Sequence, residues 1–131
     1  MRTAAKMLSI VVGVAGTIQI VLGILFWSGR ADTVIPVHVV VGLILVVSLW
    51  ILAVLAYKAG VNPNAVALAA VWGVIVPVVG LAQTRILPGG AHWVIQAVHL
   101  LLGLAAIALA QMLAGRIRHL LPPEPVHAMS S

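Results

Sequence analysis

Cysteine is absent from this sequence of 131 residues, and acidic residues are almost absent, because Asp32 and Glu124 are the only two. Without cysteine the chain has no disulfide, no thiolate metal site and no haem attached through a Cys-x-x-Cys-His motif. Seven Lys and Arg against two Asp and Glu give a formal net charge of +5. These basic residues flank apolar runs and form no basic face, so nucleic acid is not an expected partner.

Hydrophobic residues make up 63% of the chain, which is more than a water-soluble domain of this length can bury. They form continuous runs, whereas an outer-membrane barrel has short alternating segments. A helix needs about 20 apolar residues to cross a bilayer. We therefore predict one all-α domain over residues 1–115, a bundle of four transmembrane helices at about residues 4–27, 34–57, 65–87 and 91–114. Residues 116–131 are expected to be a basic, then Pro-rich, disordered tail.

Lysine and arginine predict the orientation of these helices. With the N-terminus inside, five basic residues lie on the inner side and two on the outer side, which favours both termini in the cytoplasm and a multi-pass protein of the plasma membrane. The inner residues are Arg2, Lys6, Lys58, Arg116 and Arg118, and the outer ones are Arg30 and Arg85. The lipid bilayer is therefore the first expected partner.

The second and fourth runs share a pattern. "VHVVVGL" at residues 37–43 and "VHLLLGL" at residues 98–104 each contain Val-His, three aliphatic residues and Gly-Leu. The first and third runs align as well, with Gly16 on Gly73 and Gly23 on Gly80. This indicates two helical hairpins of the same orientation, a parallel repeat. Short connections favour an up-down-up-down bundle, in which the second and fourth helices are diagonal.

The two aligned histidines, His38 and His99, are the candidate ligands of a cofactor. Neighbouring helices pack 8–10 Å apart, so the diagonal is about 12–14 Å, and two imidazoles can reach one iron between them. A bare zinc or copper ion would need further ligands that the apolar runs do not offer. We expect one haem b per chain, with Gly42 and Gly103 leaving room for the macrocycle one turn below each ligand. Alternatively, the rings bond Ser, Thr or carbonyl groups of other helices.

Three further residues are candidate partners of the haem propionates. Arg30 and Arg85 lie at the outer ends of the first and third helices, and a guanidinium group suits a carboxylate. The other interpretation is that both reach the lipid headgroups, or that Arg30 pairs with Asp32. His92 lies on the same helix face as His99 and either bonds a propionate, serves as a further ligand, or faces water at the membrane surface.

These four helices, with histidines on the second and fourth, resemble one half of haem A synthase, whose members have two four-helix bundles with axial histidines at those places. Small membrane cytochromes of the cytochrome b561 kind are a comparable match. The catalytic Glu that the family carries three residues before its first histidine is Ile35 here, and Val39 and Leu100 stand where the family often has Arg. The resemblance therefore implies the haem b bundle that passes electrons, and not haem oxidation.

The expected function is one-electron transfer near the outer face, with a quinol or another cytochrome as partner and a homodimer as an option. If the protein is an enzyme, it is an oxidoreductase or a haem-modifying enzyme. The first alternative is a non-redox haem carrier, a sensor or a haem-modifying subunit. The second is a small transporter or scaffold subunit without a cofactor, in which Pro77, Gln19, Gln83 and the histidines line a polar path.

Overall fold

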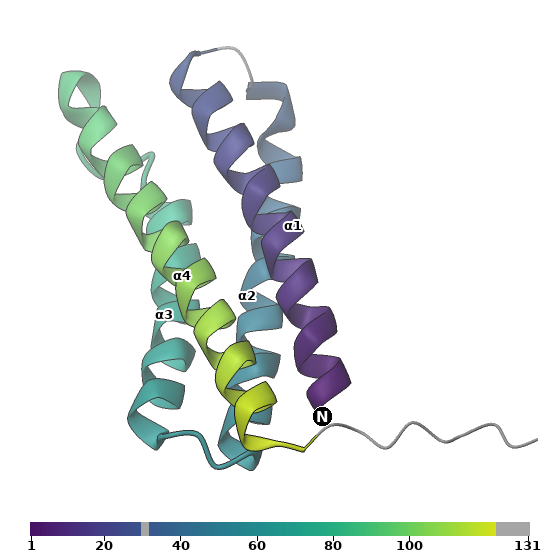
Figure 1. The fold of residues 1–131 in the computed structure, drawn as a ribbon. Coiled ribbons are helices and arrows are strands. Elements are labelled where there is room, and N and C mark those ends of the chain that lie inside the picture. The colour runs from purple at the N-terminus through teal and green to yellow at the C-terminus, as the bar shows by residue number, and fades with distance from the viewer. Residues whose placement is uncertain (30–31, 123–131) are drawn as a thin grey trace, which may run out of the picture.

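The computed structural model describes residues 1–29 and 32–122, which form a bundle of four long helices (Figure 1). The prediction of an all-α four-helix bundle is confirmed. Each helix is long and apolar enough to cross a membrane. The helices are α1 (Arg2–Trp27), α2 (Ile35–Lys58), α3 (Pro63–Ala82) and α4 (His92–Leu120), and the short 3-10 segments Asp32–Val34 and Gly89–Ala91 precede α2 and α4.

Local sequence signals account for several of the helix ends. Asn62 caps α3, because its side chain accepts a hydrogen bond from the backbone N–H of Asn64 at 2.8 Å. Proline occupies the first turn of both α2 and α3, where a missing N–H costs nothing. Gly29 and Gly60 follow α1 and α2 with φ angles of 71° and 81°, which other residues rarely adopt.

Two helix ends differ from the predicted ones. Helix α3 contains Pro77 and continues to Ala82, whereas the apolar run predicted an end at residue 87. Helix α4 continues to Leu120 instead of ending at residue 114. Arg2, near the N-terminus, stabilises this extended end of α4. Its Nη1 donates hydrogen bonds to the carbonyl oxygens of Arg118 (2.9 Å) and Leu121 (3.0 Å). Arg2 thereby satisfies carbonyl groups that the end of a helix leaves unpaired.

Consecutive helices are antiparallel and surround a common axis (Figure 1). Helices α1 and α3 each pack against both α2 and α4, and α2 and α4 also pack against each other. Helices α1 and α3 lie on opposite sides of this central pair. The histidine-bearing helices are therefore the close diagonal of the bundle.

The buried core is confined to one half of the bundle. We call residues 2–16, 45–73 and 106–122 the closed half, and the described residues of 17–44 and 74–105 the open half. Among the described residues, every buried hydrophobic side chain except Ile95 lies in the closed half. The largest fully buried ones are Val12, Leu49, Leu52, Leu113 and Ile117. The open half therefore has room for something other than a packed core.

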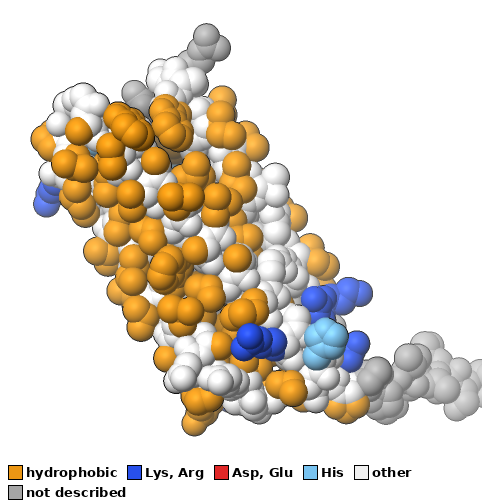
Figure 2. Space-filling view, turned by 60° about the vertical axis from the view of Figure 1, so that its left-hand side comes forward, with side chains coloured by type: hydrophobic (Ala, Val, Ile, Leu, Met, Phe, Trp, Pro, Cys, Tyr) orange, Lys and Arg blue, Asp and Glu red, His pale blue; other side chains and the backbone are white. Residues whose placement is uncertain are grey.

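The outer surface is apolar along the sides of the helices. Figure 2 shows hydrophobic side chains spread over the side of the molecule, with Lys and Arg near its two ends. Large exposed aliphatic residues occur on all four helices. A surface of this kind is suited to lipid, in which backbone groups must be satisfied within each helix.

Candidate functional site

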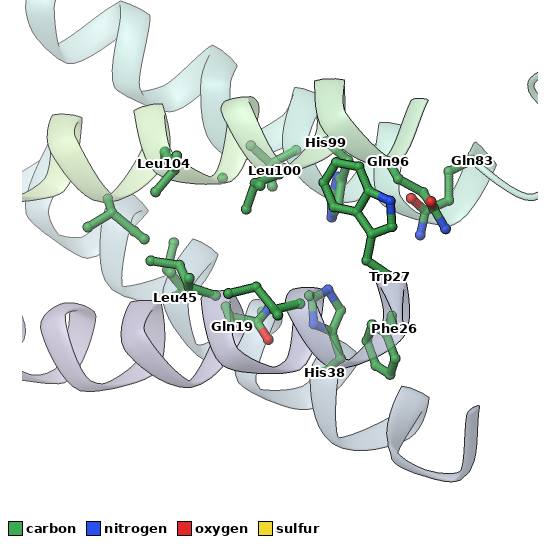
Figure 3. Close-up of a pocket in the computed structure, with 17 residues that line it drawn as sticks. Gln19, Phe26, Trp27, His38, Leu45, Gln83, Gln96, His99, Leu100 and Leu104 are labelled. Atoms are coloured by element: carbon green, nitrogen blue, oxygen red, sulfur yellow. The ribbon is translucent and has the colours of Figure 1, made fainter. Parts of the chain in front are cut away.

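The open half contains a cavity of about 870 Å³, counting its open mouth, to which all four helices contribute (Figure 3). Its polar lining consists of the imidazoles of His38 and His99, the indole of Trp27 and the amides of Gln19, Gln83 and Gln96. The other lining residues are glycines and hydrophobic residues, and no side chain of the described lining carries a formal charge. Ligand pockets typically have this mostly apolar lining with a few polar groups.

The two histidines face each other inside the cavity. His38 lies in the first turn of α2, and His99 lies about two turns into α4, since α4 begins at His92. Their ring centroids are 6.2 Å apart and the ring planes are inclined by 58°. The two residues predicted from the repeated pattern are therefore brought together. Figure 3 shows the rings on opposite sides of the gap between their helices.

Neither ring is held through its Nδ1 atom. Nδ1 of His38 and Nδ1 of His99 are both buried and have no hydrogen-bond partner among the residues that the structure describes. Packing orients the rings instead. The ring of Phe26 meets that of His38 edge-on, with centroids 5.2 Å apart at 73°. The ring of His99 lies against Gly80, where an added Cβ would be 2.8 Å from its Cε1.

Four glycines of the open half have two kinds of surroundings. A Cβ added at Gly23 or Gly103 would meet no atom within 4 Å, and both residues line the cavity. A Cβ at Gly42 would meet the Gln19 amide, and one at Gly80 would meet His99. Gly23 and Gly103 therefore widen the cavity, whereas Gly42 makes room for the side chain of Gln19 and Gly80 for that of His99.

Gln19 is the third polar group with an unpaired atom at this site. Its Oε1 is buried and has no hydrogen-bond partner within the described ranges. Gln83 and Gln96 line the end of the cavity beyond the histidines, where Figure 3 shows their amide groups near one another. A buried amide oxygen without a partner is costly in an apolar medium, so Gln19 is suited to bind a hydrogen-bond donor of a ligand.

Of the other predicted site residues, some line the cavity and some do not. Gly42 and Gly103 line the cavity together with the histidines. Arg85 is exposed in the connection after α3 and is not part of the lining, and His92 begins α4 outside the lining. Arg30 lies outside the described residues.

Several contributors to the site were not predicted from the sequence. Phe26, Trp27 and Gln96 line the cavity, and Gly80 accommodates His99. Phe26 could have been found from the sequence, because it lies next to the end of the first apolar run, a short connection away from His38. Gln96 could have been found as well, since it lies one turn before His99 on the same helix face.

The donor set limits the metals that this site can hold. Within residues 1–29 and 32–122 there is no group of three His, Cys, Asp or Glu side chains that could bind a metal ion. Protein zinc sites have three or four such ligands. Two facing imidazoles suit a metal that brings its remaining ligands with it, as the iron of haem does.

Comparison of the chain with protein-family models, with curated proteins and with solved structures finds no match. The function is therefore argued from the geometry of the cavity and its polar groups.

Proposed function

We propose that the protein is a multi-pass membrane haem b protein, in which His38 and His99 are the axial ligands of one haem. The observation that carries the proposal is the distance of 6.2 Å between the two ring centroids across the cavity. Two metal–imidazole bonds of about 2 Å each, together with the radii of the two rings, require about 6 Å between the centroids. The separation of the rings thus suits one metal atom between them.

The surroundings of the rings support the same ligand. The cavity has the mostly apolar lining with a few polar groups that is typical of cofactor sites. Gly103 leaves open space one turn from His99, as a flat macrocycle beside that ring requires. The unpaired Nδ1 atoms disfavour the alternative that both histidines are structural residues bonded to Ser, Thr or carbonyl groups.

A haem with two imidazole ligands has no open position on its iron, so it would supply one-electron transfer rather than chemistry on oxygen. The residues of this chain would bind the haem, orient it and exclude water from it. The cavity lies towards the end of the bundle where α1 meets α2 and α3 meets α4. A quinol or another cytochrome at that end is the electron partner that we propose.

The distribution of charge gives the proposed orientation. Five basic residues lie at the end of the bundle opposite the cavity, namely Arg2, Lys6, Lys58, Arg116 and Arg118. Basic residues favour the cytoplasmic side, so both termini would be cytoplasmic and the cavity would lie near the outer face of the plasma membrane. In this proposal the bundle is a duplicated hairpin, whose equivalent histidines became the two ligands.

Absorption spectra test the haem assignment. The protein, expressed with ample haem and purified in detergent, should show a Soret band and, after reduction, a sharp α-band of a b-type cytochrome. His38→Ala and His99→Ala should each weaken these bands strongly, and the double variant should abolish them. His92→Ala is the matched control, because His92 is on the same helix as His99 but outside the cavity lining. An unchanged Soret band in the double variant would refute the proposal.

The detergent-purified protein also distinguishes between the alternative functions. A cofactor-free transporter or scaffold would be colourless despite the haem supply. A haem carrier would lose its haem to an added apo-globin within minutes. An electron-transfer protein would keep its haem under these conditions and would be reduced reversibly.

A further inference from the structure

Helices α1 and α4 are tightly joined in the closed half. Ser9 Oγ donates to Oε1 of Gln111 at 2.6 Å, and Nε2 of Gln111 donates to the carbonyl oxygen of Ser9 at 2.9 Å. Helices α1 and α4 are still in close contact at Gly16, the last α1 residue of the closed half. A Cβ added to Gly16 would be 2.6 Å from Cδ1 of Ile107. Small residues at such interfaces let membrane helices approach closely. No ligand can pass between the two helices in this half.

The same two helices are separate in the open half. Gly23 on α1 and Gly103 on α4 both line the cavity, and a Cβ on either one would meet no atom within 4 Å. Figure 1 shows the two ribbons moving apart toward the ends where α1 meets α2 and α3 meets α4. We call the space between Gly23, Ile24, Gly103 and Leu104 the side slot.

The rims of the side slot are exposed aliphatic residues. Ile24 is 59% exposed and Leu104 is 41% exposed, although both line the cavity. Each belongs to a helix that is apolar enough to cross a membrane. Exposed aliphatic side chains of α1 and α4 therefore border the cavity, on helices whose surroundings in a membrane-spanning protein are acyl chains.

We infer that the ligand of this cavity enters sideways from the bilayer, through the side slot between α1 and α4. The ligand belongs to the class of flat, lipid-soluble amphipathic molecules. Its apolar body passes between Ile24 and Leu104, and its polar groups stay near Gln83 and Gln96 at the end of the cavity. The identity of the ligand as haem rests on the proposed function, whereas the route rests on the geometry of α1 and α4.

The absence of cysteine makes a direct test simple, because each introduced cysteine carries a single spin label. The label is placed with Gly103→Cys, which points into open space, and separately with Gly23→Cys on the facing helix. Collision rates with molecular oxygen, which partitions into lipid, and with a water-soluble nickel chelate are measured in the apoprotein in phosphatidylcholine vesicles. Leu101→Cys, at a side chain 64% exposed on α4, is the lipid control, and Thr84→Cys in the exposed connection is the water control.

Labels at positions 23 and 103 should collide several-fold more often with oxygen than with the nickel chelate, as the label at 101 does. Labels that collide mainly with the nickel chelate, as at 84, would show that the cavity opens to water and would overturn the inference. Labels inaccessible to both agents would show a closed slot and would also overturn it. Circular dichroism confirms that each labelled variant is folded.

A haem titration of the unlabelled protein separates this inference from the proposed function. Oxygen-accessible labels in a protein that binds no haem would leave the side slot in place and refute haem as its ligand. A protein with the bands of a b-type cytochrome, but with labels accessible mainly to the nickel chelate, would retain the haem and refute the route.

Discussion

The side-chain amide of Gln19 occupies the space beside Gly42: a Cβ added at Gly42 would be 2.6 Å from Nε2 of Gln19. Gly42 lies one turn from His38 on α2, so α1 contacts the histidine helix through this glycine. The sequence suggested that Gly42 makes room for a macrocycle. The structure adds a second reason, because an amide of the neighbouring helix needs the same space.

We predict that Gly42→Ala is slightly destabilising, because the added Cβ must displace the Gln19 amide. The amide is the far end of a flexible side chain, so the cost should be at the lower end of the range of about 1–3 kcal/mol that is typical of overpacking. The cost should fall in a Gln19→Ala background, where the amide is gone, so the two substitutions should couple in a double-mutant cycle. Thermal unfolding in detergent, followed by circular dichroism, measures all four proteins. Equal costs of Gly42→Ala in both backgrounds would contradict the contact.

The helices were predictable because the bilayer imposes a simple length rule on apolar runs. Their ends were less predictable. The extension of α4 to Leu120 depends on Ile117, which is fully buried, and on the hydrogen bonds from Arg2 at the other terminus. Hydropathy in a window contains no such long-range contact.

The candidate site, like the helices, was only partly predictable from the sequence. The pairing of His38 with His99 followed from a repeated pattern and from the topology of the bundle. The surroundings of the rings did not follow, since contacts of Phe26 and Gly80 depend on how side chains of different helices interlock. Arg85 was expected beside the ligand, at the end of the third helix. Because α3 ends at Ala82, Arg85 lies in the connection instead and is exposed.

The hydrogen-bonded pair of Ser9 and Gln111 gives a second prediction. Gln111→Ala removes both hydrogen bonds between Ser9 and Gln111, which help to join α1 to α4 in the closed half. Interhelical hydrogen bonds in membranes contribute about 0.6 kcal/mol each on average, so the loss should be about 1 kcal/mol. Gln83→Ala is the control, because no hydrogen bond joins its side chain to another described residue. The free energy of unfolding in a denaturing detergent titration measures the difference, and equal values for both variants would contradict the prediction.

Trp72 provides a third prediction. Its Nε1 donates to the carbonyl oxygen of Leu102 at 2.9 Å and joins α3 to α4. Trp72→Phe keeps an aromatic ring but removes the donor, so the unfolding free energy should fall by about 1 kcal/mol. Trp93→Phe is the matched control, because Trp93 is exposed and no hydrogen bond joins its indole to another described residue. A Trp72→Phe variant as stable as the Trp93→Phe variant would show that the bond contributes nothing.

The last prediction concerns Gly80, which sets the position of His99 without lining the cavity itself. A Cβ at position 80 would lie 2.8 Å from Cε1 and 3.2 Å from Nε2 of His99, so Gly80→Ala must displace the ring. Metal affinity falls about 10–100-fold when a group that orients a ligand is changed. If His99 is an axial ligand, Gly80→Ala should therefore weaken haem binding at least about tenfold, while the helices stay folded.

The control for Gly80→Ala is Gly115, which lies on α4 outside the cavity lining. A Cβ at Gly115 would meet no atom within 4 Å. Gly115→Ala should therefore leave haem affinity within about twofold, and it should raise helix stability slightly, because glycine costs up to about 1 kcal/mol relative to alanine in a helix. Haem titration by absorbance gives both affinities. If the two alanine variants bind haem equally well, the ring of His99 does not hold the haem in the position that the structure gives it.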